Sequence, residues 1–122
     1  MATEIVADHV ELARDFLERS KSYLVRGDLH QASEKGWGAA SHIIKAVAAA
    51  NGWEYARHDD FDSVVINARQ RYRQPSLRQY GNSAQSLHRN YYKRSLLLNA
   101  SIIQEEIGDV EEMVNILQPF LV

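Results

Sequence analysis

One stretch constrains the fold of this chain more than any other: residues 29–58, LHQASEKGWGAASHIIKAVAAANGWEYARH. Its apolar residues recur at three- and four-residue steps, which is the spacing of one face of an α-helix. Asp28 precedes the stretch as an expected N-cap, and Asn51-Gly52 supplies the left-handed residue at which helices end. We therefore predict a helix from Leu29 to Asn51. Such an apolar helix belongs in the middle of a bundle, where small residues let a neighbour approach closely: Gly36, Gly38, Ala39 and Ala40.

The other periodic segments also predict helices, over residues 4–25, 61–72, 83–106 and 110–117. Pro75 limits the helix over 61–72, because proline disfavours helical geometry in the residue before it. Gly108 followed by Asp109 predicts the end of the helix over 83–106 and the cap of the last one. We therefore predict an all-α fold that forms a single domain over residues 1–122. Because short loops join antiparallel helices, we expect an up-and-down four-helix bundle with a short fifth C-terminal helix.

Composition excludes several classes of protein. The chain has 122 residues, a net charge of −2 and no cysteine, which rules out disulfides and cysteine-based metal or redox chemistry. The first residues are amphipathic and acidic and lack the apolar core of a signal peptide. No apolar run approaches the roughly 20 residues that span a bilayer. We therefore expect a soluble cytoplasmic protein.

Charge is distributed unevenly along the chain. From Ser63 to Gln104 there is no Asp or Glu, and this basic segment carries seven cations: Arg69, Arg71, Arg73, Arg78, Arg89, Lys93 and Arg94. A segment of one sign attracts anions such as the phosphates of RNA. Interleaved tyrosines offer rings on which a base can stack: Tyr72, Tyr80, Tyr91 and Tyr92. The other interpretation is that the basic segment pairs with the acidic residues of segments 4–25 and 105–112, in the same chain or in a dimer mate.

Three stretches of the sequence resemble a known family. They are ASEKGWGAASHIIKAVAAANG, a histidine before an aspartate cap, and SLHRNYYK. The chain resembles the HEPN superfamily of small helical-bundle proteins and, within it, the PaREP family. That family has a central helix rich in lysine and tryptophan, then Gly, His and a Leu-His-x-Asn-aromatic-aromatic element. The matching residues are Lys35, Trp37, Lys45, Gly52, His58, Leu87, His88, Asn90, Tyr91 and Tyr92.

The resemblance implies a bundle that commonly dimerises, in a superfamily linked to RNA cleavage and to toxin–antitoxin pairs. It also implies a nucleotidyltransferase-like protein as a second kind of partner. Many nucleases of the superfamily use an Arg and a His a few residues apart, near the start of the fourth helix. This sequence departs from that pattern. Arg89 fits its first half, but Arg94, Ser95 and Leu96 occupy the places where the His is needed.

His88 is the best single candidate for a catalytic residue, with Arg89 beside it and Arg78 expected to approach from a loop. A histidine among cations can transfer a proton at a phosphodiester. The other interpretation is a structural histidine that holds its helix in place by hydrogen bonding. His9, His42 and His88 lie on different predicted helices, but none belongs to a His-x-x-x-His or Glu-x-x-His pair. We expect no metal site and no cofactor.

These observations lead to one prediction of function and one alternative. The chain is expected to be a HEPN-like, non-catalytic binding protein that acts as a homodimer and contacts RNA through the basic surface of the helix over 83–106. Apolar residues that one bundle cannot bury favour the dimer: Leu96, Leu97, Leu98, Phe120, Leu121 and Val122. The alternative is a HEPN-type, toxin-like ribonuclease with a non-standard site around His88. An interaction protein that pairs with a nucleotidyltransferase-like protein also stays open.

Overall fold

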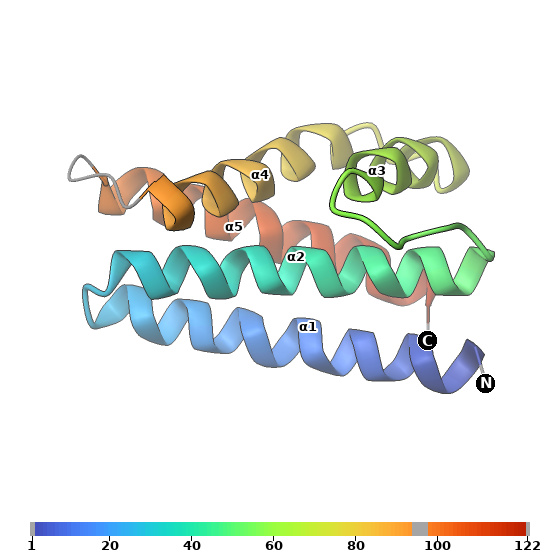
Figure 1. The fold of residues 1–122 in the computed structure, drawn as a ribbon, viewed down its shortest axis with the longest axis horizontal. Coiled ribbons are helices and arrows are strands. Elements are labelled where there is room, and N and C mark those ends of the chain that lie inside the picture. Colours follow the sequence, from blue (N-terminus) through green and yellow to red (C-terminus); the bar gives the residue numbers. More distant parts are fainter. Residues whose placement is uncertain (1, 94–97, 122) are drawn as a thin grey trace.

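The computed structural model describes residues 2–93 and 98–121, and for residues 91–93 only the backbone. These residues form five α-helices and no strand, so the prediction of an all-α chain is confirmed (Figure 1). The helices are α1 (Ala2–Val25), α2 (Leu29–Asn51), α3 (Asp60–Arg71), α4 (Leu77–Lys93) and α5 (Ala100–Leu117), followed by a short 3-10 helix, η1 (Gln118–Phe120). No helix of this described part is long and apolar enough to cross a bilayer.

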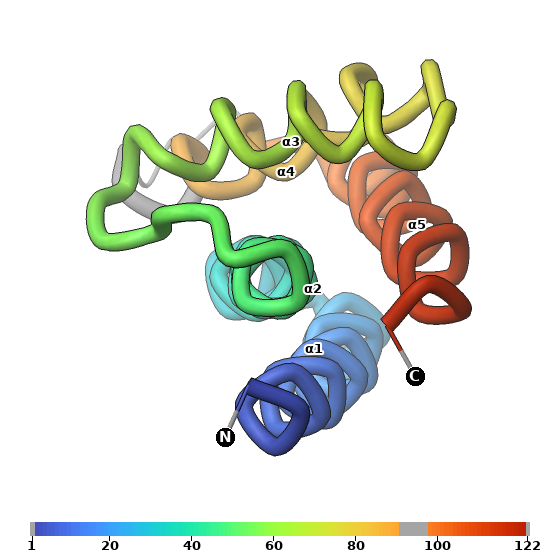
Figure 2. Tube along the Cα trace, turned by 90° about the vertical axis from the view of Figure 1, so that its right-hand side faces the viewer, coloured from blue at the N-terminus to red at the C-terminus, as the bar shows by residue number. Residues whose placement is uncertain are grey.

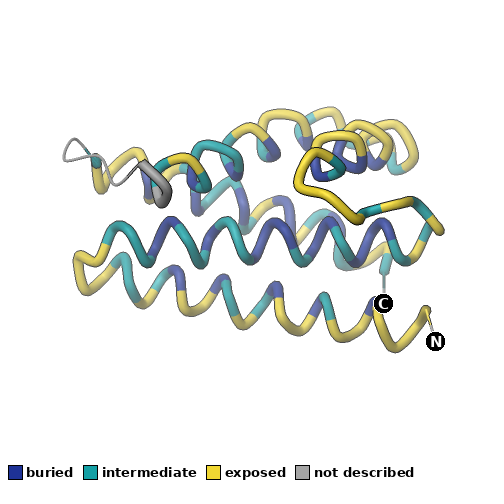
Figure 3. Tube along the Cα trace, in the orientation of Figure 1, coloured by how far each residue is buried: buried dark blue, intermediate teal, exposed yellow. Residues whose placement is uncertain are grey.

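Helix α2 lies in the middle of the molecule and contacts each of the other four α-helices. α1 runs along one side of it, α3 and α4 cover the opposite side, and α5 contacts α1, α2 and α4 (Figure 2). Much of α2 is therefore buried, drawn in dark blue, whereas the outer side of α1 is mostly exposed, drawn in yellow (Figure 3). The central position follows from composition, because most of the buried residues of α2 are small: Ala32, Ser33, Gly36, Ala39, Ala40, Ser41, Ala46 and Ala48. The other buried residues of α2 are Ile43, Ile44 and Val47.

Both ends of α2 are set by the residues that the sequence indicated. The Asp28 side chain accepts a hydrogen bond from the backbone N–H of Gln31 at 3.1 Å. At the other end, Gly52 has a φ of 69°, and its N–H bonds to the carbonyl of Ala48. Glycine adopts this left-handed conformation without the steric penalty that a Cβ brings. The predicted boundaries of this helix are confirmed.

Gly36 marks a point where side chains of three other helices pack closely on α2. A Cβ placed on it would lie 2.9 Å from Cδ1 of Leu87 in α4. The same Cβ would lie 3.3 Å from Oγ of Ser20 in α1 and 3.4 Å from Cγ1 of Ile107 in α5. The missing side chain therefore allows three neighbours to pack on one spot of the central helix.

The predicted helix over 83–106 is wrong, because two helices share this part of the chain. α4 already begins at Leu77, where a loop was expected, and it ends at Lys93. α5 begins at Ala100, and the side chain of Asn99 caps it by accepting a hydrogen bond from the N–H of Ile102 at 3.1 Å. Leu96 and Leu97 lie outside the described residues.

The expected end of the helix over 83–106 at Gly108 and the expected cap of the last helix at Asp109 are wrong for the same reason. Gly108 and Asp109 lie inside α5, which is 18 residues long and not the short helix that was predicted. Asp109 does not cap α5 but accepts a hydrogen bond from Oγ of Ser83 in α4 at 2.6 Å. This aspartate therefore ties α5 to α4.

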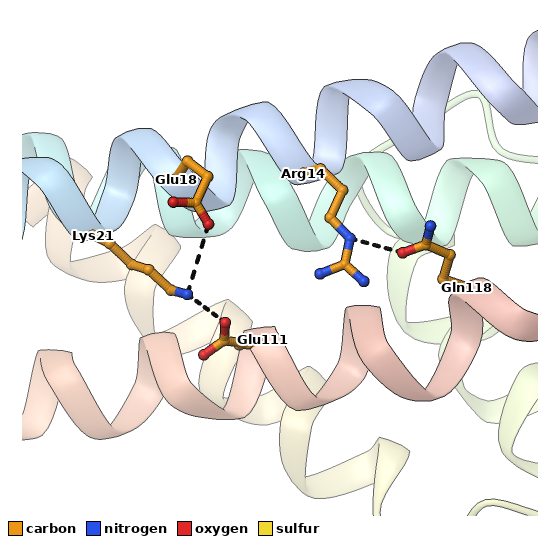
Figure 4. A network of polar contacts seen from close by, with 5 residues as sticks. All are labelled: Arg14, Glu18, Lys21, Glu111 and Gln118. Carbon is orange, nitrogen blue, oxygen red and sulfur yellow. Dashed lines mark hydrogen bonds and ion pairs between the residues drawn. The ribbon is translucent and has the colours of Figure 1, made fainter.

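Polar contacts join α1 to the end of the chain (Figure 4). The Lys21 ammonium pairs with Glu111 of α5 and lies 3.7 Å from Glu18. Nε of Arg14 donates a hydrogen bond to Oε1 of Gln118 at 2.7 Å. One acidic residue of the predicted 105–112 segment is thus engaged with a lysine of α1 and not with the basic segment.

Two histidines meet where α1 packs on α2. Nδ1 of His9 lies 3.0 Å from Nδ1 of His42, and the His42 ring stacks on Phe16 with centroids 5.4 Å apart. A hydrogen bond between two such nitrogens needs one of them to be an unprotonated acceptor. Burial, the Lys45 charge and the charge of His9 lower the pKa of His42 to about 4. Burial, followed by Lys45, also lowers the pKa of His9.

We expect this pair to make stability depend on pH. Because the pKa of His42 is lower in the folded chain than the ordinary 6.5, the unfolded chain binds protons more readily between these values. Stability is then full above about pH 6.5 and falls as the pH drops towards 4. His42 is only half-buried, so solvent screening reduces the effect to about 1 kcal/mol. Urea unfolding of the protein and of His42→Asn at pH 7 and pH 4.5 tests this. An equal loss in both proteins would assign the pH dependence to other groups.

Candidate functional site

A groove between α3 and α4 carries two of the seven cations that the sequence singled out, Arg78 and Arg89. Arg78, Asn82, Gln85 and Arg89 follow one another at steps of three and four residues, so they share one face of α4. Two adjoining cavities lie along this face. One of about 330 Å³ is lined by His58, Asp59, Asp62, Asn82, Gln85 and Arg89. The other, of about 280 Å³, is lined by Asp62, Val65, Ile66, Arg78, Gly81 and Asn82. Because both are lined by Asp62 and Asn82, they lie side by side, and we call them together the α3–α4 groove.

Three aromatic rings meet at the end of this groove. The His58 and His88 centroids are 4.7 Å apart, and Trp37 lies 4.5 Å from His88 and 5.2 Å from His58. Trp37 comes from the central helix, His58 from the connector before α3, and His88 from α4. His58 is exposed, whereas His88 is half-buried and already engaged in contacts. We call these three residues the histidine cluster.

The surroundings of His88 favour a neutral ring. Burial is the largest cause that lowers its pKa, and the positive charges of His58 and Arg89 act in the same direction. A neutral imidazole near pH 7 accepts protons. The site therefore contains a proton acceptor beside an exposed histidine and an arginine.

Glu106 of α5 is a carboxylate that interacts electrostatically with Arg89. Its Oε1 is buried and has no hydrogen-bond partner among the described residues. Burial raises the pKa of Glu106, although a hydrogen bond from Ser86 and the charge of Arg89 act in the opposite direction. The nearby carboxylates of Asp109 and Glu105 also raise its pKa, in the same direction as burial.

The arginines of the basic segment face solvent. All five whose side chains are described are exposed, and within the described part of the chain none forms an ion pair: Arg69, Arg71, Arg73, Arg78 and Arg89. The ion pairs found there use Arg19, Lys21 and Lys35, all on α1 or α2. Within residues 2–93 and 98–121, these five arginines therefore do not pair with acidic side chains. Arg94 and the side chain of Lys93 lie outside the described residues.

The three residues predicted around a catalytic site are only partly brought together. His88 and Arg89 lie at the end of the groove near His58. Arg78 lies in the first turn of α4 and not in a loop, ten residues before His88, which is about 15 Å along the helix axis. It therefore lines the other end of the groove. Whether any of these residues is catalytic stays a prediction.

Sequence reasoning missed two members of this site. His58 was not connected with His88, and Glu106 was placed at the end of a helix over 83–106, whereas it lies inside α5. No periodicity links His58 to His88, because a connector and the whole of α3 separate them. Only the packing of α3 against α2 and α4 brings these residues together.

The four interleaved tyrosines have different environments. Tyr72 stacks on Phe120 with ring centroids 4.4 Å apart. Tyr80 is half-buried and packs against the core. The side chains of Tyr91 and Tyr92 lie outside the described residues.

The histidines considered as metal ligands do not gather in one place. His9 and His42 contact each other between α1 and α2, whereas His88 belongs to the histidine cluster. Among residues 2–93 and 98–121, no three His, Cys, Asp or Glu side chains lie where they could hold a metal ion.

Comparison with known proteins gives one result. The model of the archaeal PaREP1/PaREP8 family matches residues 8–114, which is most of the chain. No curated protein and no solved structure matches it.

Proposed function

We propose that this chain, which belongs to the archaeal PaREP1/PaREP8 family, is a homodimeric, non-catalytic protein that binds RNA through its α3–α4 surface. This surface is the one that carries Arg69, Arg71, Arg73, Arg78 and Arg89. One observation supports this more than any other: the five described arginines of the basic segment are exposed and make no ion pair within the described residues. Guanidinium groups bind phosphate oxygens in a bidentate manner and are the residues of choice for such contacts.

The arrangement of the helices supports the finer proposal of a HEPN-like bundle. α1, α2, α4 and α5 form the four main helices of that bundle, and α3 is the additional one, lying over α2 and α4 (Figures 1 and 2). This differs from the expected layout, in which the fifth helix came last. The basic surface then belongs to α3 and α4 together, and not to a single helix.

The chemistry of the α3–α4 groove also bears on what it binds. Asp59 and Asp62 line it together with Arg89, and Gln85 donates a hydrogen bond to Asp62 at 3.3 Å. The groove therefore mixes cations and carboxylates with neutral hydrogen-bonding groups. Single-stranded RNA presents both phosphates and unpaired base edges, whereas a simple polyanion presents only charge. We infer that single-stranded RNA is the better fit.

Titration with a labelled single-stranded RNA tests the proposal. We expect weak binding that depends strongly on salt, because two to five arginine–phosphate contacts give a slope of log affinity against log salt of about −1.4 to −3.5. Fluorescence anisotropy between 50 and 200 mM salt measures this slope. No binding even at 50 mM salt would contradict the proposal.

Apolar residues left on the surface support a homodimer. Several large ones are about half-exposed although they belong to packed helices: Ile5, Leu12, Ile66, Ile102 and Phe120. Of the residues expected to form the dimer surface, Leu98 and Leu121 are half-buried, while Leu96, Leu97 and Val122 lie outside the described part. Light scattering at micromolar concentration should give twice the chain mass of 13.9 kDa. The mass of a single chain, with association only when a nucleotidyltransferase-like protein is added, would contradict the homodimer.

The histidine cluster supports a second candidate function, that of a toxin-like ribonuclease. In this reaction His88 takes the proton from a 2′-hydroxyl, whose oxygen attacks the neighbouring phosphorus. His58 gives a proton to the departing 5′-oxygen, and Arg89 stabilises the negative charge that develops on the phosphate. The contact between the two histidine rings, at 4.7 Å, is what favours this alternative.

The variant His88→Ala distinguishes the two functions. We expect no RNA cleavage by the unmodified protein, and a loss of about 1–2 kcal/mol in the free energy of unfolding, because the His88 ring packs on Trp37 and His58. Chemical unfolding and an RNA cleavage assay measure these two quantities. His58→Ala is the matched control, since this exposed ring contributes less to packing. Cleavage by the unmodified protein that both variants lose while staying folded would establish the ribonuclease.

A further inference from the structure

Tyr72 and Phe120 form an aromatic stack at the surface, away from the α3–α4 groove. Their rings are 4.4 Å apart and inclined by 21°. Tyr72 follows the last residue of α3, and Phe120 ends η1. Phe120 remains 49 % exposed although Tyr72 covers one of its faces. A large apolar ring thus stays about half-exposed although it is stacked on one side.

Hydrogen bonds fix the position of Tyr72 in the stack. Nδ2 of Asn51, at the end of α2, donates hydrogen bonds of 2.8 Å to the hydroxyl of Tyr72 and to the carbonyl of Val47. The backbone N–H of Tyr72 bonds to the carbonyl of Ala68, also at 2.8 Å. A ring fixed in this way loses little freedom when a ligand stacks on the aromatic pair.

An open cavity of about 380 Å³ adjoins the stack. It is lined by Ala50, Asn51, Arg71, Tyr72, Arg73 and Phe120, so its described lining contains two guanidinium groups and no carboxylate. This distinguishes it from the α3–α4 groove, where two aspartates lie near Arg89. The volume falls within the range of about 300 to 1,000 Å³ that is typical of small-ligand sites.

The backbone at Arg73 is unusual. Its φ is 56°, and it is the only described residue other than glycine with a positive φ. The N–H of Gln74 bonds to the carbonyl of Arg69 at 3.0 Å, so Arg73 occupies the left-handed position that ends α3 in a Schellman motif. The turn places Arg73 beside the stack, together with Arg71.

We propose that this cavity binds one nucleotide of an RNA strand, with the base stacked on Phe120 and its phosphate held by Arg71 and Arg73. The inference rests on the proposed RNA-binding function and names the place where a base is recognised. Flat π-surfaces bind every base without strong sequence preference, and paired guanidinium groups bind phosphate. A free nucleotide has the same chemistry, so the test includes both sources.

The probe is a 12-nucleotide oligoadenylate that carries 2-aminopurine at one end, with AMP and inorganic phosphate as competitors. We expect binding to quench the 2-aminopurine fluorescence and AMP to compete better than phosphate. Phe120→Leu keeps an apolar side chain but removes the π-face, and should weaken binding roughly 5- to 100-fold. Arg73→Gly should weaken binding without lowering the melting temperature, because glycine adopts a φ of 56° without strain.

Each outcome decides something. If the RNA binds and neither variant weakens it, the inference is wrong and the proposed function stands. If only AMP binds, and Phe120→Leu weakens it, the cavity is a site for free nucleotides and the proposed RNA binding is wrong. If neither ligand binds, both are wrong. If Arg73→Gly lowers the melting temperature and leaves binding unchanged, Arg73 serves only the fold.

Discussion

The double variant Arg78→Glu/Arg89→Glu is expected to bind single-stranded RNA on the order of 100-fold more weakly than the unmodified protein. These two arginines lie at opposite ends of the α3–α4 groove and on one face of α4. The exchange removes two guanidinium groups that hold phosphate and adds two repulsive charges beside Asp62, which lines both cavities. The salt slope should also become shallower by about 1.4, because two fewer phosphates are neutralised.

The matched control is Arg19→Glu/Arg26→Glu, which changes the net charge by the same amount. Both of these arginines are exposed near the end of α1, on the side of α2 opposite to α3 and α4 (Figure 2). We expect the affinity of this control for RNA to fall by less than about threefold, through long-range electrostatics only. Equal losses in the two double variants would mean that RNA binding depends on net charge and not on the α3–α4 surface.

Gly36→Val is expected to lower the free energy of unfolding by about 2–3 kcal/mol. Even a single Cβ at this position would lie 2.9 Å from Leu87, and valine adds two further methyl groups. Because Ser20 and Ile107 close the remaining sides, the strain is shared by α1, α4 and α5. Urea unfolding followed by circular dichroism measures the change.

Gly108→Val is the control for this substitution, because Gly108 lies inside α5 with no atom within 4 Å of the added Cβ. Its stability should stay within about 0.5 kcal/mol of the unmodified protein or rise slightly, since glycine is unfavourable inside a helix. If both glycine variants lose the same stability, the close approach at Gly36 is not what holds the four helices together.

The central helix was predictable because its signals are local. Asp28 and Gly52 act within a few residues of the helix ends, and small apolar residues on most sides of a helix leave it no place but the interior. The inward residues of α3 were predictable for the same reason, since Phe61, Val64, Val65 and Ala68 repeat at helical spacing and are all buried.

The boundary between α4 and α5 was not predicted, because the sequence offers two candidate caps for the last helix. Gly108-Asp109 has the composition of a helix end and a new cap, but Asp109 instead bonds to Ser83 across the helix pair. Asn99, the residue that does cap α5, stands directly after an apolar run that suits a helix interior. Tertiary contact decided between two plausible caps, and a sequence pattern does not record that contact.

The candidate sites divide in a similar way. Exposed arginines follow from charge patterning, so the basic segment was found in the sequence. The contacts of His58 with His88 and of Tyr72 with Phe120 join residues 30 or more positions apart and arise only from the way α3 packs.

NMR of the arginine side chains during an RNA titration tests the proposed surface most directly. The Nε–Hε resonances of Arg69, Arg71, Arg73, Arg78 and Arg89 report on α3 and α4, while those of Arg19 in α1 and Arg26 directly after it serve as internal controls, the α1 group. We expect single-stranded RNA to shift the first group progressively and to leave the α1 group almost unchanged. Shifts confined to the α1 arginines, or no shifts at low salt, would contradict RNA binding by the α3–α4 surface.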